Sequence, residues 1–278
     1  MADGANMSAH SIKTPWGQPS GDIIKGKVGD ADVLFLSRHG AGHRLPPGDI
    51  NYRANIDALK QMGATDVISI SACGSLREEL PPGAFVVVDQ FIDRTTMREK
   101  TFFGDGFTAH VSMADPVCPA LQKALVQTCA ALDIPHKDGG VYLCMDGPQF
   151  SSRAESHMYR QWGCDVIGMT NMPEAKLARE AELPYATVAM VTDYDCWRES
   201  EKAVEVADVL EVMRENTARA EKLIVALAER LGPIRSPSPL GIETALDFAV
   251  ITDAASRSDD MTMKLQTIAG RYLAAQSE

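Results

Sequence analysis

The amino-acid sequence predicts an α/β fold in which helices cover both faces of a largely parallel sheet. Short apolar runs rich in β-branched residues alternate along the chain with amphipathic segments, and this alternation is typical of parallel sheets. The runs at 66–71 and 186–192 lack a clean alternation of apolar and polar residues, as expected for strands that are buried on both sides. No apolar run approaches the roughly 20 residues that a membrane span needs.

The expected strands and helices follow one another in a regular order. The strands are 33–37, 66–71, 84–89, 140–145, 165–169 and 186–192, and the helices are 51–62, 119–132, 152–162, 173–182 and 206–231. Ser152 followed by Glu155 forms a capping-box pattern, and Pro173 suits the first turn of a helix. The long last helix has apolar residues at steps of three and four and ends at a Gly-Pro pair. Two shorter helical patterns follow, so 232–278 is expected to form a C-terminal helical appendage within a single domain of 1–278.

The composition excludes several classes of function. The chain of 278 residues has a formal net charge of −11, which argues against a nucleic-acid partner or an anionic membrane surface. A small anionic substrate would need a local positive pocket. The six cysteines are scattered and form no C-x-x-C pair, so reduced core thiols of a cytoplasmic protein are expected, with no disulfide and no zinc site.

Two segments that directly follow predicted strands could bind an anion. In the first, Arg38 stands beside His39, and a guanidinium group offers a fork of donors that matches phosphate oxygens; the alternative is an ordinary solvated loop. In the second, Ser71 and Ala72 open a small-residue run whose backbone N–H groups could approach an anion or a sugar. Its alternative is a plain turn, and Cys73 as a nucleophile lacks an identifiable partner base.

Two further segments could hold a flat ring. Phe150, in a Gly-Pro-Gln-Phe run, and Met169, after the next strand, could clamp a heterocycle or a sugar face, although such side chains are more often core. Asp193 and Asp195 lie on the same side of an extended segment, where they could bind a metal, share a proton or hydrogen-bond a heterocycle. Solvated loop acids are the alternative, but Tyr194 and Trp197 indicate partial burial; a metal would need more ligands, so none is expected.

Taken together and in this order, these segments resemble the trimeric purine nucleoside phosphorylases, and within that family the methylthioadenosine phosphorylase branch. The matching runs are LSRHG at 36–40, NYRAN at 51–55, SACGSLREE at 71–79, DQFIDRT at 89–95, GPQFSSRAES at 147–156, GMTNMPE at 168–174 and AMVTDYDCW at 189–197. No single run is decisive, but their register along about 14–231 is highly specific.

The resemblance implies a homotrimer of single-domain subunits, each with a twisted mixed sheet flanked by helices, and it assigns roles to residues. It implies that phosphate is bound by Arg38, His39, Ser71, Ala72 and Thr170. It also implies that Met169 contacts the ribose of the nucleoside and that Phe150, Ser151, Asp193 and Asp195 contact the purine. The 5′-thiomethyl group would be bordered by Val206 and Val209, and by His110 of the adjacent subunit.

The implied reaction is phosphorolysis of S-methyl-5′-thioadenosine, with inorganic phosphate as co-substrate and no cofactor or metal. Asp193 would protonate N7 of the departing adenine if burial near Asp195 raises its pKa. An acid at 193 also favours a 6-aminopurine, since relatives that cleave 6-oxopurines typically carry Asn there. The alternatives are phosphorolysis of other purine nucleosides, or a catalytically impaired nucleoside-binding subunit.

One departure from the family pattern concerns the phosphate site. Related chains begin with a strand that runs into a Gly-Gly-Thr/Ser-Gly loop, and this sequence contains no Gly-Gly-x-Gly. A central strand and part of the phosphate cradle are therefore expected to be absent, which would cost several kcal/mol of transition-state stabilisation. A start site placed too late, a shortened chain and a natural variant with impaired catalysis are the competing explanations.

Overall fold

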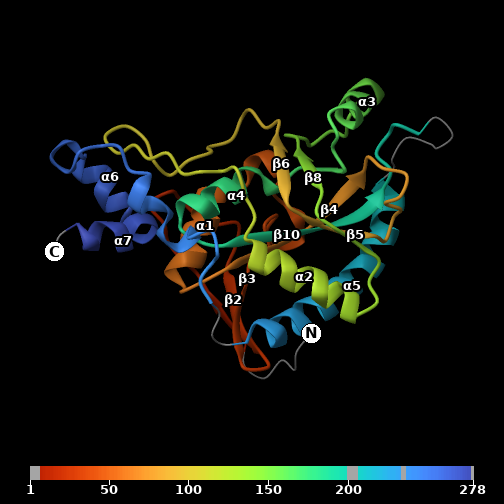
Figure 1. The fold of residues 1–278 in the computed structure, drawn as a ribbon, viewed down its shortest axis with the longest axis horizontal. Helices are drawn as coiled ribbons and strands as arrows, with labels where there is room; N and C mark the ends of the chain where they lie inside the picture. Colours follow the sequence, from red (N-terminus) through yellow and green to blue (C-terminus); the bar gives the residue numbers. More distant parts are fainter. Residues whose placement is uncertain (1–6, 199–205, 233–235, 277–278) are drawn as a thin grey trace.

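A central sheet of seven strands organises the molecule (Figure 1). The structure, a computed structural model, describes residues 7–198, 206–232 and 236–276. In sheet order the strands are β6 (Gln90–Asp93), β8 (Val141–Cys144), β9 (Val166–Gly168), β4 (Val67–Ser75), β10 (Tyr185–Asp193), β5 (Phe85–Val88) and β7 (His136–Asp138). Neighbours are parallel except at β4–β9 and β10–β5, which are antiparallel. The sheet is therefore mixed, as the family resemblance implied.

A second, three-stranded antiparallel sheet lies beside the first. It consists of β1 (Ser8–His10), β2 (Ile23–Val28) and β3 (Ala31–Phe35), in that order. Only β3 was expected from the sequence, because β2 mixes two lysines and a glycine with its apolar residues and β1 has only three residues. The short strands β6 and β7 were missed as well, while the six predicted strands all formed, with ends shifted by one to four residues.

The predicted helices all formed. They are α1 (Tyr52–Gln61), α2 (Pro119–Ala131), α3 (Arg153–Gln161), α4 (Asn171–Glu180) and α5 (Val206–Leu231), followed by α6 (Asp259–Lys264) and α7 (Gln266–Ala275). Four 3₁₀ segments complete the described elements: Ala41–His43, Pro47–Asp49, Ile242–Phe248 and Ala254–Ser256. The capping box of α3 is present, with Ser152 and Glu155 bonding each other's backbone N–H. Helix α4 begins before Pro173, which lies in its first turn.

Helices cover both faces of the central sheet. Helices α2 and α5 pack against β10 on one face, in a cluster that includes Leu121 and Leu223. Helices α1 and α4 lie on the other face, in a cluster that includes Ile56 and Leu177. Strand β10, paired on both edges, is buried from Tyr185 to Thr192. None of the described helices combines the length and apolar character needed to cross a bilayer.

The C-terminal helices pack onto the body of the molecule. Lys60 Nζ on α1 donates to the carbonyl of Ile268 on α7 at 2.9 Å, and Arg271 of α7 pairs with the buried carboxylate of Glu182 at 2.6 Å. Both contacts join residues beyond 232 to the sheet-and-helix body. All six cysteines are free thiols, and five of them are buried.

Candidate active site

The first group of predicted residues meets at Arg38, just after β3. Its guanidinium group makes a two-pronged ion pair with Glu174 on α4, with Nε to Oε2 at 2.7 Å and Nη2 to Oε1 at 2.8 Å. Nη2 also donates to Ser69 Oγ at 2.6 Å. Because two carboxylate oxygens are matched to two N–H donors, this pairing fixes the plane of the guanidinium group.

A chain of buried hydrogen bonds connects this ion pair to Ser71. Ser71 Oγ donates to Asn171 Oδ1 at 3.0 Å, and Asn171 Nδ2 donates to Tyr185 Oη at 3.2 Å. Tyr185 Oη in turn donates to Glu174 Oε1 at 3.0 Å. Arg38 and Ser71 therefore belong to one polar network, even though they come from different elements.

Thr170 and Ala72 border the same network. Thr170 is buried and directly precedes α4, and Ala72 follows Ser71 on β4. The backbone of α4 is not helical at Met172, whose N–H donates to Cys144 Sγ at 3.4 Å, so the positive charge of this corner comes from Arg38, which Glu174 pairs. His39 points elsewhere: its Nδ1 bonds the carbonyl of Leu45 at 2.8 Å, and its ring stacks on His43 at 4.0 Å between centroids. Burial lowers the pKa of His39.

The second group is formed by the two acids at the end of β10. Asp193 Oδ1 accepts the backbone N–H of Asp195 at 2.8 Å, and Asp193 Oδ2 accepts the hydroxyl of Thr192 at 2.7 Å. Asp195 adopts a left-handed backbone with φ of 51°. Its Oδ2 is buried and makes no well-oriented hydrogen bond with the described residues, although the hydroxyl groups of Ser156 and Ser151 lie close enough to oppose the rise of its pKa. A buried carboxyl oxygen without a partner is costly, unless a ligand supplies one.

Burial sets the protonation of both acids. It raises the pKa of Asp193, although hydrogen bonds from Thr192 and from the Asp195 backbone partly oppose the rise. Burial raises the pKa of Asp195 to about 6, and the nearby charge of Asp193 adds to the rise. A raised pKa favours the protonated form of a carboxyl group, and a protonated carboxyl group can act as a general acid. Among the described residues, no three His, Cys, Asp or Glu side chains converge as a metal site would require.

Glycine at position 74 makes room for these acids. Gly74 is the β4 partner of Asp193, and a Cβ atom there would lie 2.9 Å from Asp193 Oδ1 and 3.3 Å from Asp195 Cβ. Any side chain at this position would therefore push the carboxyl group of Asp193 out of place.

The loop that carries Phe150 and Ser151 lies beside the acids. Cys196 Sγ contacts the carbonyl of Ser151 at 3.2 Å, which joins the loop to the segment after β10. Phe150 is 48% exposed, so its ring is available to a ligand rather than packed in the core. Met169 also lies against this loop, because a Cβ atom added at Gly147 would be 2.4 Å from the Met169 sulfur.

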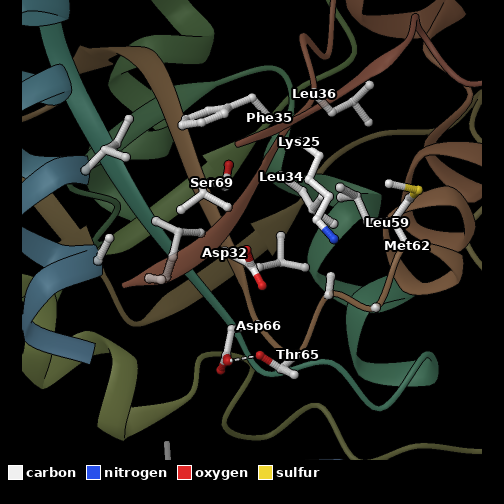
Figure 2. A pocket seen from close by; sticks show the side chains of 18 of the residues that line it. Lys25, Asp32, Leu34, Phe35, Leu36, Leu59, Met62, Thr65, Asp66 and Ser69 are labelled. Carbon is white, nitrogen blue, oxygen red and sulfur yellow. Dashed lines mark hydrogen bonds between the residues drawn. The ribbon is translucent and has the colours of Figure 1, made fainter. Parts of the chain in front are cut away.

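The two groups lie along one strand. Ser71 and Gly74 are three residues apart on β4, which corresponds to roughly 10 Å at the usual rise of a strand. This separation suits a ligand with an anion at one end and a ring at the other. Arg38 lines a groove (Figure 2) whose lining does not include Asp193 or Phe150. The Arg38 group and the Asp193 group are therefore neighbours along β4, but they do not line the same described groove.

His110 is not brought to this place within the chain, and the side chains of Val206 and Val209 are outside the described residues. His110 is exposed and lies in another groove, with Lys176 and Glu180. Its backbone N–H donates to the carbonyl of Ala249 at 2.8 Å. Its assignment to a neighbouring subunit stays a prediction. Val206 and Val209 themselves belong to α5.

Several residues that support the site carry no signal in the sequence that marks them as functional. Glu174 and Asn171 lie in the run GMTNMPE at 168–174, but neither had a role of its own. Their hydrogen-bond network with Arg38 and Ser71 forms only when β3, β4 and α4 come together in the fold. Arg98 is buried, and its Nη1 donates to the carbonyls of Met169 at 2.7 Å and Met172 at 2.6 Å. Its Nη2 donates to the carbonyl of Asp146 at 2.9 Å. No local pattern distinguishes this arginine from a surface one.

Comparison with known proteins identifies the family and the fold. Residues 2–229 match the family model described as the Phosphorylase superfamily. The S-methyl-5′-thioadenosine phosphorylase of Rhodospirillum rubrum is 54% identical over 263 residues, which cover 95% of this chain and 90% of that protein.

Two solved structures have the same fold. A methylthioadenosine phosphorylase from an antarctic soil metagenomic library is 45% identical, with a TM-score of 0.88 over 95% of this chain and 92% of that one. Methylthioadenosine phosphorylase from Schistosoma mansoni in complex with adenine is 36% identical, with a TM-score of 0.82 over 91% and 92%. This chain belongs to the phosphorylase superfamily and, within it, to the S-methyl-5′-thioadenosine phosphorylase family.

Proposed function

We propose that this protein is a pentosyltransferase that cleaves S-methyl-5′-thioadenosine with inorganic phosphate, giving adenine and 5-methylthioribose 1-phosphate. The observation that carries the proposal is the buried pair Asp193 and Asp195, with raised pKa values, about 10 Å along β4 from the polar network of Arg38 and Ser71. The identity of 54% to a relative of that name supports the same substrate.

The reaction follows from what each end of the site can do. A phosphate oxygen forms a bond to C1′ of the ribose as the bond from C1′ to N9 of the purine breaks. The sugar passes through a state with oxocarbenium character, as in glycoside cleavage generally, and the phosphate charge stabilises it. Phosphate would lie near Arg38, Ser71 and Thr170, whose side chains could supply donors to its oxygens.

The leaving purine takes the bonding electrons and needs a proton. Asp193, with its raised pKa, would donate that proton to N7, and Asp195 would hydrogen-bond the base. Adenine then leaves as a neutral molecule, which is a far better leaving group than its anion. No step in this scheme calls for a metal or a redox cofactor.

The oligomeric state, the cellular location and the roles of His110, Val206 and Val209 are part of the same proposal. We propose a cytoplasmic homotrimer in which His110 of one subunit reaches the nucleoside site of its neighbour, while Val206 and Val209 border the 5′-thiomethyl group. The exposure of His110 supports this arrangement, since a residue that serves a neighbour must face outward. Sedimentation equilibrium would test it, and a mass of one chain would contradict it.

The decisive experiment follows adenine release from methylthioadenosine by chromatography, with and without phosphate. We expect release that requires phosphate and saturates with it, and slower cleavage of inosine under the same conditions. Faster cleavage of inosine would overturn the substrate. Binding of methylthioadenosine without phosphate-dependent release of adenine would overturn the enzymatic activity.

A further inference from the structure

Tyr142 is a buried tyrosine of β8 whose hydroxyl group reaches across the neighbouring strand. Its ring packs in the apolar cluster on the α4 face of the sheet, and Phe91 contacts it edge-on, with 5.9 Å between ring centroids. A Cβ atom added at Gly168 of β9 would lie 1.9 Å from Tyr142 Oη. The hydroxyl group therefore lies directly over the Gly168 backbone, on the strand that separates β8 from β4.

This hydroxyl group makes no well-oriented hydrogen bond with the described residues. Tyr142 is 0% exposed, and a buried hydroxyl group without a partner is costly. Ser71 of β4 is within its reach: burial raises the pKa of Tyr142, and the Ser71 hydroxyl lies close enough to oppose that rise. The partner that Tyr142 can find is therefore a residue of the predicted phosphate site.

The hydrogen bonds around Ser71 run in one direction. Asn171 Nδ2 donates to Tyr185 Oη at 3.2 Å and to Thr187 Oγ1 at 2.6 Å, which uses both of its N–H groups. Asn171 Oδ1 is therefore the acceptor that faces Ser71, and Ser71 Oγ donates to it at 3.0 Å. Because a serine hydroxyl has one proton and two lone pairs, Ser71 can only accept from Tyr142, and Tyr142 can only donate.

A hydrogen bond from Tyr142 would complete a chain of donors that ends on a carboxylate. Tyr185 Oη donates to Glu174 Oε1 at 3.0 Å, and Glu174 pairs with Arg38. Hydrogen bonds in such a chain polarise one another, so a Ser71 hydroxyl that accepts a bond becomes a stronger donor. Ser71 Oγ would also be held from two sides, by Asn171 and by Tyr142.

We propose that Tyr142 is a positioning residue for the phosphate site, whose hydroxyl group donates to Ser71 Oγ and holds it in place for a phosphate oxygen. When phosphate binds, the Ser71 proton turns from Asn171 to the anion, and the bond from Tyr142 keeps Oγ where it is. Tyr142 acts only through Ser71, since its own side chain is fully buried. The inference rests on the phosphorolysis proposed above, in which Ser71 binds phosphate.

The test is Tyr142→Phe, which removes the hydroxyl group and keeps the ring. Calorimetric titration of inorganic phosphate into the full chain without nucleoside gives the phosphate Kd, and adenine release from methylthioadenosine gives the kinetic constants. We expect the Kd and KM of phosphate to rise about three- to tenfold, as for one neutral hydrogen bond. The KM of methylthioadenosine and kcat at saturating phosphate should stay nearly unchanged.

The matched control is Tyr272→Phe on α7. Tyr272 is also buried, and its hydroxyl group accepts from Arg257 Nη2 at 2.9 Å. Its loss removes a hydrogen bond of a buried tyrosine away from Ser71, so the Kd and KM of phosphate should equal those of the parent.

A double-mutant cycle separates positioning from a general structural role. Ser71→Ala should weaken phosphate binding by itself, and Tyr142→Phe should weaken it no further in that background, because the residue through which Tyr142 acts is gone. A tyrosine that merely supports the fold would weaken binding by the same factor in both backgrounds, which contradicts the proposal.

Two other results would overturn the role of Tyr142: a phosphate Kd of Tyr142→Phe equal to that of the parent, or equal increases in the KM of phosphate and of methylthioadenosine. The parent protein keeps the two proposals apart. A parent that binds phosphate but releases no adenine contradicts the phosphorolysis alone. A parent that releases adenine, together with a variant of unchanged phosphate affinity, contradicts the role of Tyr142 alone.

Discussion

At the scale of single residues, the candidate functional side chains are oriented by ion pairs and hydrogen bonds to neighbouring residues. Arg38 is oriented by Glu174, and Glu174 by Tyr185. Asp193 is held between Thr192 and the backbone of Asp195. Arg38, Asp193 and Asp195 could be proposed from the sequence, because they stand at or just after the end of a strand and have distinctive side chains. Their supports could not, because Arg38 and Glu174 are 136 residues apart.

The role of Asp193 gives the first prediction. Asp193→Asn should lower turnover of methylthioadenosine about 100-fold or more, within the range of lost general acids, and change its KM only a few-fold. Asparagine preserves the shape of the side chain and can still hydrogen-bond, but it has no proton of suitable pKa to donate. Steady-state kinetics would check this, with the exposed Asp22→Asn as the matched control. Unchanged turnover would remove Asp193 from the acid role.

The second prediction concerns the space in front of that acid. Gly74→Ala should reduce turnover by at least tenfold, because the added methyl group would meet Asp193 Oδ1 at 2.9 Å and displace the carboxyl group. The phosphate KM should change little, since Ser71 and Arg38 are distant from the new methyl group. The matched control is Gly21→Ala, where no atom lies within 4 Å of the added Cβ. Turnover of the Gly74→Ala variant at the level of the parent would contradict the proposed placement.

At the scale of elements, local signals predicted helices better than short strands. The capping box at Ser152 and the Gly-Pro pair after α5 specified helix ends to within about one residue. Short polar strands, such as β7 with its His-Lys-Asp sequence, carry no pattern of their own. They form because the ladder to a neighbouring strand stabilises them. The antiparallel direction of β5 likewise follows from tertiary packing and has no signature in its own residues.

The cap of α3 gives a prediction at this scale. Ser152→Ala should lower the free energy of unfolding by about 1 kcal/mol, the usual value of an N-cap hydroxyl. Two bonds are lost, since the Ser152 side chain accepts from the Glu155 backbone and Glu155 is thereby oriented towards the Ser152 backbone. Urea denaturation would measure the change, and Ser152→Asp should restore most of the stability. Loss of several kcal/mol would mean that α3 depends on more than its cap.

At the scale of the whole molecule, the arrangement of two sheets could not be predicted from the sequence. Strand β3 was expected as part of one sheet, but the structure places it in a separate sheet with β1 and β2 (Figure 1). Local patterns specify which residues form strands, whereas the pairing of strands depends on the whole set that is present.

Stability as a function of pH depends on acids that folding buries, and Glu180 at the end of α4 is the clearest of them. Its carboxyl accepts the backbone N–H of Phe102 and the hydroxyl of Thr101, both at 2.7 Å. Burial nonetheless raises its pKa from 4.5 to about 7. The folded protein therefore binds more protons at this site than the unfolded chain between pH 4.5 and 7, so stability falls as the pH rises through that range. Above pH 7 both states are ionised and the effect is constant.

Glu180→Gln should remove this dependence. An amide stays neutral at every pH. The free energy of unfolding of the variant should therefore not show the decrease of up to about 3 kcal/mol between pH 4.5 and 7 that the raised pKa implies for the parent. The Gln variant should therefore be less stable than the parent near pH 4.5, where glutamic acid donates and accepts without charge, and comparable or more stable at pH 8. Urea unfolding at the two pH values measures the difference, with the exposed Glu229→Gln as control. A constant difference between parent and variant across this range would show that the pKa of Glu180 is the same in the folded and unfolded states.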